Sequence, residues 1–183
     1  MSNTTKIIFD TEFTGLHQNT TLISLGLISD NGKTFYSEFT DYAKSQVNDW
    51  IQENVIDIMS PNTMTDYYCH GKSKFISKSL KRWLSQFENV EWVADVGHYD
   101  FVLLLNLLYG EALNAPDNIC AAYHDLNQDI AWFYNISDIE AFNKSREDIL
   151  RENGITIEGT KHNALYDAKV AKAIYEKINI MRY

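Results

Sequence analysis

The sequence predicts an α/β fold in which a mixed five-stranded sheet carries helices on both faces. Three β-forming segments follow one another near the amino terminus with short turns between them, which predicts an antiparallel meander. Farther along the chain, helical segments alternate with two further strand-like segments, which is typical of parallel strands joined by helices. With 183 residues, the chain is expected to form a single domain over residues 1–183.

The meander has a clear turn signal. Its three strands are expected at residues 6–13, 21–29 and 34–40. Between the second and third strands stands Asp30-Asn31-Gly32-Lys33, a strong hairpin signal because Asn-Gly suits a type I′ turn. Residues 41–68 show only short helical pieces with no clean period, notably near Asn48.

The second half of the chain alternates between the two element types. Strands are expected at residues 90–96 and 118–126, and helices at residues 74–87, 99–109, 128–134, 145–153 and 164–178. The helix at 74–87 is amphipathic, whereas the one at 99–109 is apolar nearly all round, as a buried helix is.

Composition narrows the functional classes. A formal net charge of −9 argues against a broad basic surface that grips duplex DNA, although bound cations could supply positive charge locally. Cys69 and Cys120 are too few for a disulfide framework, so both are expected to be reduced thiols. The sequence has no charged-then-apolar leader and no apolar run near 18 residues, so we expect a cytoplasmic protein without a membrane segment.

Two acidic residues end the first strand. Side chains alternate along a strand, so Asp10 and Glu12 fall on one face. Phe9, Thr11 and Phe13 fall on the other face. Two carboxylates about 7 Å apart repel unless a cation lies between them or one takes up a proton, and a hard cation such as Mg²⁺ meets that need. A solvated edge strand explains the pair equally well unless other residues join it.

Two later segments carry residues that could join the pair. Asp100 stands where a strand ends and an apolar helix begins, and a helix-starting role is the simpler local interpretation. Asp167 lies at helical spacing with Ala171 and Ile174, so it projects from the face that packs on the sheet. A carboxylate there is unfavourable unless it is paired or metal-bound. His162, five residues earlier, lies within reach of the same point.

In combination, these segments resemble the DEDDh group of 3′-to-5′ exonucleases, which have the ribonuclease H-like fold. The first motif of that group, Asp-x-Glu followed by Thr-Gly, matches the stretch Asp10-Thr11-Glu12-Phe13-Thr14-Gly15-Leu16. The second, an Asp after an aromatic residue, matches Tyr99-Asp100-Phe101. The third, His-x₄-Asp, matches His162-Asn163-Ala164-Leu165-Tyr166-Asp167-Ala168. The sister group has Tyr where this chain has Asn163, which indicates the His type.

Within the group, the chain is most similar to the small RNase AS-type exoribonucleases. The similarity lies in the Phe9-Asp10-Thr11-Glu12-Phe13 opening, in residues 48–55 and in residues 96–110. It implies a homodimer that removes nucleoside 5′-monophosphates from the 3′ end of single-stranded RNA or of a 3′ overhang, with a preference for adenylate tails.

The resemblance also implies roles for particular residues. It implies two Mg²⁺ ions, which Mn²⁺ can replace, with Asp10 bridging both, Glu12 and Asp167 on the first, and Asp100 helping to hold the second. His162 is implied to be the general base, a task suited to a group that titrates near neutrality. The implied substrate-binding residues are Glu12, Phe13, Thr14, Gly15 and Tyr99, with Glu12 touching the terminal 3′ hydroxyl.

Three alternatives stay open at this point. The same site could act on DNA or on very short oligonucleotides, because sequence does not show a contact to the 2′ hydroxyl. A catalytically dead binding module of this fold would be expected to lack a site residue, and none is missing. The basic face of the helix at 74–87 could guide RNA, but a solvated charged face is the more common case; it comprises Lys74, Lys78, Lys81 and Arg82.

Overall fold

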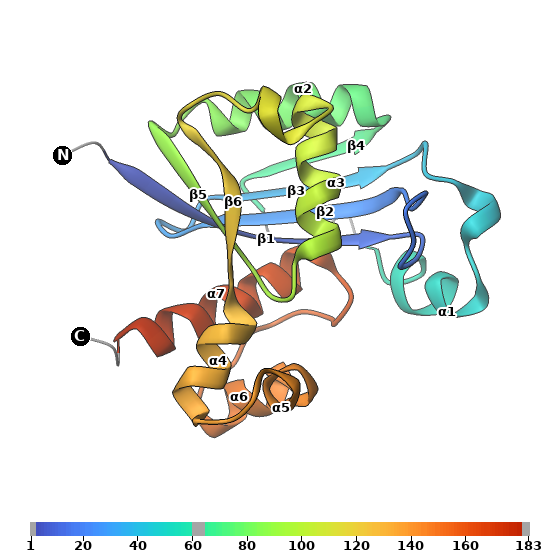
Figure 1. Ribbon diagram of the computed structural model, residues 1–183. Helices are drawn as coiled ribbons and strands as arrows, with labels where there is room; N and C mark the ends of the chain where they lie inside the picture. The colour runs from blue at the N-terminus through green and yellow to red at the C-terminus, as the bar shows by residue number, and fades with distance from the viewer. Residues whose placement is uncertain (1–2, 60–64, 181–183) are drawn as a thin grey trace.

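The computed structural model describes residues 3–59 and 65–180. Within those ranges the strands form one six-stranded mixed sheet (Figure 1). They are β1 Thr4–Phe13, β2 Leu22–Ser29, β3 Thr34–Phe39, β4 Tyr67–Gly71, β5 Asn89–Ala94 and β6 Ile119–Asp125. Their order across the sheet is β4-β3-β2-β1-β5-β6. β1 lies between β2 and β5, but β5 pairs only with Thr4–Ile8, so the carboxyl end of β1 pairs with β2 alone and extends past the end of β5.

The predicted meander is confirmed. β1 pairs with β2 and β2 with β3, both antiparallel, and β5 then adds to β1 in parallel. The hairpin between β2 and β3 closes where Ser29 N–H donates to the carbonyl of Lys33 over 2.9 Å. The turn is not the type I′ turn predicted, because Asn31 lacks the positive φ that such a turn requires at both central residues. Instead, Gly32 N–H donates to the Ser29 carbonyl at 2.9 Å, and of the loop residues Asp30, Asn31 and Gly32 only Gly32 has a positive φ, of 88°.

The sheet has one strand more than the five predicted. Tyr67 and Tyr68 were expected in a segment of helical pieces, but they open β4, which pairs in parallel with β3 at the sheet edge. The Tyr67 ring stacks on Phe35, with centroids 5.4 Å apart. Only Cys69 of this five-residue strand is fully buried, so no alternating pattern was present to reveal it.

The helices agree with the prediction except at their ends and for one short helix. They are α1 Asp49–Ile51, α2 Ser73–Leu84, α3 His98–Tyr109, α4 Leu126–Tyr134, α5 Asp138–Asn143, α6 Arg146–Glu152 and α7 Ala164–Ile180. A π-helical turn, Gln52–Ile56, continues α1, and 3₁₀ turns cover Lys44–Gln46 and Ala112–Asn114. The prediction missed α5, although Ser137 and Glu140 form a capping box at its start.

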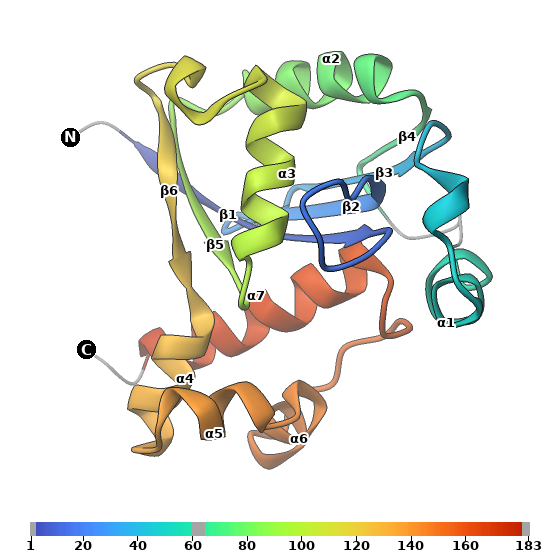
Figure 2. The same ribbon diagram turned by 45° about the vertical axis from the view of Figure 1, so that its right-hand side comes forward.

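Helices cover both faces of the sheet (Figures 1 and 2). The face of β1 that bears Phe9 packs in the core beneath α2 and α3, and the face that bears Ile8 packs against α4, α6 and α7. The alternation predicted for β1 is therefore confirmed, and Asp10 and Glu12 share the Ile8 face. Among the described helices, none combines the length and the apolar character needed to cross a membrane.

Candidate active site

Asp10 and Glu12 lie near the end of the central strand, under the start of α7. A register shift in the β1–β2 ladder follows Glu12, where the chain leaves the sheet. Gly26 on β2 pairs with Asp10, and an added Cβ at Gly26 would lie 2.3 Å from the backbone nitrogen of Leu165. Glycine at this position therefore allows the first turn of α7 to approach the sheet next to the two acids.

Asp100 reaches the same strand from α3. Its Oδ1 accepts hydrogen bonds from Thr11 N–H at 3.0 Å and from Thr11 Oγ1 at 2.6 Å. The N-cap residue of α3 is Gly97, which makes no side-chain cap bond. The contacts of Asp100 are thus with β1, across 89 positions of sequence, rather than those of a simple helix cap.

His162 and Asp167 are joined at the start of α7. The backbone N–H of His162 donates to Asp167 Oδ2 at 2.8 Å, and His162 has a positive φ of 65°. Asn163 holds the first turn, because its Oδ1 accepts from the N–H groups of Leu165 and Tyr166. His162 Nδ1 lies 4.0 Å from Glu12 Oε1, so the loop before α7 turns its ring toward β1.

The predicted catalytic residues line one open cleft of about 880 Å³. Asp10, Glu12 and Asp100 lie on it together with His162 and Asp167. One wall is formed by residues 48–55 around α1, and another by residues 142–147 between α5 and α6. The structure therefore brings together five side chains that are spread over more than 150 positions of sequence.

The carboxyl groups in the cleft hold protons more tightly than ordinary acids. Burial, followed by repulsion from Asp167 and Asp100, raises the pKa of Glu12 to about 9. Burial raises the pKa of Asp167 to about 7. The pKa of Asp10 lies well above its usual 3.8, through burial and then through the charges of Asp167, Asp100 and Glu12. Without a compensating cation, the site is strained by its own negative charge.

The pKa of His162 is lowered, whereas that of Asp100 is raised like those of the other acids. Burial and then Lys161 lower the pKa of His162, so its ring is neutral at pH 7. Burial raises the pKa of Asp100, and the two hydrogen bonds from Thr11 act in the opposite direction.

The donor set fits a hard divalent cation. One ligand atom each from Glu12, His162 and Asp167 lies within 4.8 Å of the other two. Carboxylate oxygens, which Mg²⁺ and Mn²⁺ prefer, dominate the floor of the cleft. The raised pKa values of these acids also favour a metal site, because a bound cation would relieve the mutual repulsion that contributes to them.

The remaining predicted residues lie around this floor. Phe13 and Gly15 line the cleft. The Phe13 ring stacks on Tyr99, with centroids 5.9 Å apart. Thr14 is buried, and its hydroxyl donates to Gln46 Oε1 at 2.5 Å. The four basic side chains of α2 are exposed, and none of them lines the cleft.

Sequence reasoning did not identify several cleft residues. Trp50, 53% exposed, sets its ring edge-on to His162 with centroids 5.1 Å apart. Leu16 and Phe142 also line the cleft as large, exposed apolar side chains. Leu16 and Trp50 stand in segments that carry the family resemblance, but neither was assigned a role there, and Phe142 is a single apolar residue without a period or motif that marks a site.

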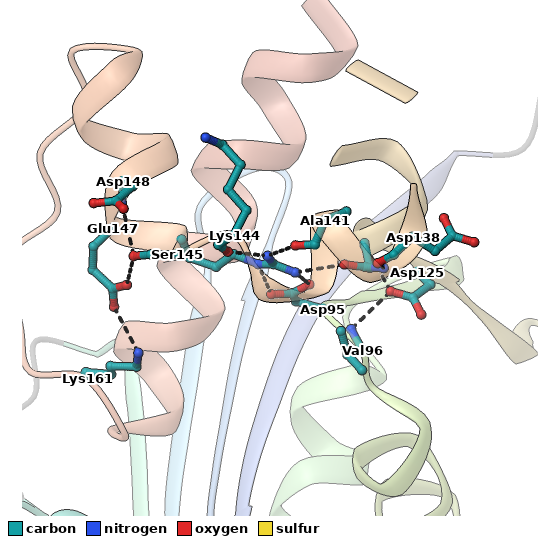
Figure 3. A network of polar contacts seen from close by, with 12 residues as sticks. Asp95, Val96, Asp125, Asp138, Ala141, Lys144, Ser145, Glu147, Asp148 and Lys161 are labelled. Atoms are coloured by element: carbon teal, nitrogen blue, oxygen red, sulfur yellow. Dashed lines mark hydrogen bonds and ion pairs between the residues drawn. The ribbon is translucent and has the colours of Figure 1, made fainter. Parts of the chain in front are cut away.

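A partly buried ion pair on the cleft was also missed. Asp95 directly follows β5 and lines the cleft, and Arg146 of α6 binds it (Figure 3). Figure 3 shows the polar network around Asp95, in which Arg146 also donates to the carbonyls of Ala141 and Lys144. No local pattern in the sequence marks this pair, because its two residues are 51 positions apart.

The chain is similar in sequence to known exoribonucleases. The family model described as the 3′-5′ exoribonuclease Rv2179c-like domain matches residues 5–179. The 3′-5′ exoribonuclease Rv2179c of Mycobacterium tuberculosis is 23% identical over 123 residues, which cover 67% of this chain and 72% of that protein.

Solved structures share the fold at low sequence identity. The nuclease domain of 3′hExo, a DEDDh family member bound to rAMP, has a TM-score of 0.68 at 14% identity and covers 97% of this chain and 92% of that one. S. pombe Pop2p, in a form with Mg²⁺ and Mn²⁺ bound, has a TM-score of 0.64 at 17% identity, covering 95% and 82%. The α/β fold of this chain is therefore ribonuclease H-like.

Proposed function

Because the chain belongs to the 3′-5′ exoribonuclease Rv2179c-like domain family, it is a 3′-5′ exoribonuclease, and we propose that it trims single-stranded RNA by two-metal-ion hydrolysis. The observation that carries this proposal is the convergence of four acids and His162 on the floor of one open cleft. The acids are Asp10, Glu12, Asp100 and Asp167.

Metal ions have a defined place in the proposal. The four acids would hold two divalent cations, Mg²⁺ or Mn²⁺, which would supply positive charge and lower the pKa of bound water. Thr11 fixes the carboxylate of Asp100 through two hydrogen bonds. The N–H of His162 fixes the carboxylate of Asp167 in the same way, so both acids are oriented before substrate arrives.

His162 acts as the general base. Its ring is neutral at pH 7, because burial lowers its pKa, and it therefore accepts a proton from the attacking water. The oxygen of that water forms a bond to the scissile phosphorus, and the bond from phosphorus to the 3′ oxygen of the preceding nucleotide breaks. That 3′ oxygen takes up a proton, so the products are a nucleoside 5′-monophosphate and RNA shortened by one nucleotide.

The rim of the cleft favours an unpaired strand. Leu16, Trp50 and Phe142 expose apolar surface around a polar floor. Bases that have left a duplex can stack on such side chains, whereas paired bases keep their faces buried within the helix. Lys161, also on the cleft and 60% exposed in its side chain, lies 3.7 Å from Glu147 and is a cation on the cleft that a phosphate could contact.

A single set of reactions tests the proposal. The protein is incubated with Mg²⁺ and 5′-labelled single-stranded and duplex RNA, with an internally labelled circular RNA, and with 5′-labelled single-stranded DNA of the same sequence. We expect one-nucleotide ladders from the single-stranded RNA, nucleoside 5′-monophosphate as the product, and no cutting of the circle. Asp10→Asn serves as the inactive control. Cleavage of the circle, or equal rates on duplex and single strand, would contradict the proposal.

A further inference from the structure

Asp95 is a fifth carboxylate beside the floor of the cleft. The parallel ladder pairs Ile8 of β1 with Val93 of β5, and both side chains pack in the core on the α7 side. Asp95 follows the end of β5 directly, and both Asp10 and Asp95 line the cleft. The charge of Asp95 acts on Asp10, whose pKa it helps to raise after the larger effects of Asp167, Asp100 and Glu12.

What separates Asp95 from the other acids is its partner. Arg146 donates from Nε to Asp95 Oδ2 at 2.5 Å and from Nη2 to Oδ1 at 2.6 Å, which occupies both carboxylate oxygens. The two side chains are only 14% and 22% exposed, so the pair is little screened by water.

Every N–H group of the Arg146 guanidinium donates a hydrogen bond within the chain. Its other N–H groups donate to the carbonyls of Ala141 and Lys144, each at 2.7 Å, and to Asn127 Oδ1 at 3.2 Å. All five donors of Arg146 are thus used within the chain, and none is left for a phosphate. Arg146 is therefore placed to act on Asp95 and on the wall of the cleft, and not on substrate.

We propose that Arg146 is a positioning residue that withholds Asp95 from the metal centre, so that four carboxylates face the cations instead of five. This inference rests on the proposed two-metal function. Mg²⁺ requires near-ideal octahedral geometry and keeps several waters, so an additional carboxylate beside Asp10 would capture the cation in an unproductive arrangement. The bidentate pair opposes this by neutralising the charge of Asp95 and by holding its carboxylate toward Arg146.

Metal binding gives a readout that does not depend on turnover. Calorimetric titration with Mg²⁺ or Mn²⁺, without RNA, compares the parent with three variants. Arg146→Met frees a carboxylate and should tighten metal binding, whereas Asp95→Asn leaves an unpaired guanidinium and should weaken it. The double variant has neither charge and should bind close to the parent. Arg151→Met is the matched control, because Arg151 lies on the same helix but is 75% exposed in its side chain.

Turnover of single-stranded RNA gives the second readout. Arg146→Met should lower kcat by about 10- to 100-fold, as changes behind metal ligands do, and adding Asp95→Asn should recover most of that loss. If Arg146 only anchors the wall of the cleft, the second substitution will not restore kcat and metal affinity will not rise. That result overturns the proposal.

Two further measurements keep the test decisive. If Arg146→Met does not fold by circular dichroism, Arg146→Lys replaces it: Lys keeps the charge, so metal affinity should stay near that of the parent. A rise in affinity with Arg146→Lys equal to that expected on losing the charge would overturn the proposal. A parent protein that degrades RNA without needing divalent metal would instead refute the proposed function itself.

Discussion

The raised pKa values of the acids in the cleft predict that the metal-free protein becomes less stable as pH rises. Asp167 has a folded pKa of about 7 against an ordinary 3.8, and Glu12 about 9 against 4.5. Below about pH 4 both groups are protonated whether the chain is folded or not, so they cost nothing. Above 4, the unfolded chain releases these protons while the folded chain keeps them. Stability therefore falls as pH rises through the folded pKa values.

The size of the effect follows from Asp167 alone. A shift of about three pH units corresponds to roughly 4 kcal/mol of unfolding free energy, which is lost between about pH 4 and pH 8. A protein of this length changes its Tm by about 2–4 °C per kcal/mol, so the fall should be on the order of 10 °C. Glu12 extends the same fall toward about pH 9.

Thermal unfolding in a chelator checks this prediction. Tm is measured by circular dichroism from acidic to alkaline pH, with and without millimolar Mg²⁺. Because metal binds the deprotonated carboxylates, Mg²⁺ should stabilise the protein most at the alkaline end and flatten the fall. Asp10→Asn should also reduce the fall, whereas the exposed Asp117→Asn should not. A metal-free Tm that stays level or rises from acidic to alkaline pH would refute the reasoning.

Three further substitutions test separate parts of the site. His162→Ala should slow single turnover by about 10²–10⁴-fold at saturating Mg²⁺ and abolish the acidic limb of the pH–rate profile; a limb that persists would exclude His162 as the base. Trp50→Ala should lower kcat/KM by about 5- to 150-fold on RNA with a normal 3′-terminal base, but much less on RNA whose terminal nucleotide is abasic. Gly26→Ala should lower the unfolding free energy by about 1–3 kcal/mol and reduce activity, because the new Cβ meets the backbone of Leu165; unchanged Tm and turnover would contradict the close approach.

Sequence patterns sufficed wherever a residue type and its spacing carry the information. The carboxylates of Asp10 and Glu12 share a face because strand geometry requires it, and the structure bears this out. Asp167 was identifiable because a carboxylate on the apolar side of α7 is unfavourable unless it is paired or bound to a metal. The Asn31-Gly32 pair likewise predicted the β2–β3 hairpin, although Asn31 lacks the positive φ of the type I′ turn expected there.

Features that depend on long-range packing were not predictable. β4 pairs with β3 across about 30 positions of sequence, and one fully buried residue, Cys69, leaves no period to read. Arg146 and Asp95 are 51 positions apart, and each is a charged residue of a type usually found on the surface, with no local pattern that marks it as paired. Asp95 follows β5 and Asp10 lies on β1, so only the fold brings both to one cleft. Such contacts depend on the topology of the whole fold, which cannot be read from local patterns in a single sequence.

Backbone strain at the two helix entrances shows why a motif alone underdetermines the site. Val96 and His162 both have positive φ, 54° and 65°, and they precede the helices that carry Asp100 and Asp167. Such a conformation costs on the order of 1–3 kcal/mol, more for a β-branched residue, and persists only where the surroundings enforce it. Here a carboxylate enforces each: Asp125 Oδ1 accepts from Val96 N–H at 3.0 Å, and Asp167 Oδ2 accepts from His162 N–H at 2.8 Å. Asp167 is thus both a proposed metal ligand and the clamp that orients the proposed base, so replacing it should disturb both functions together.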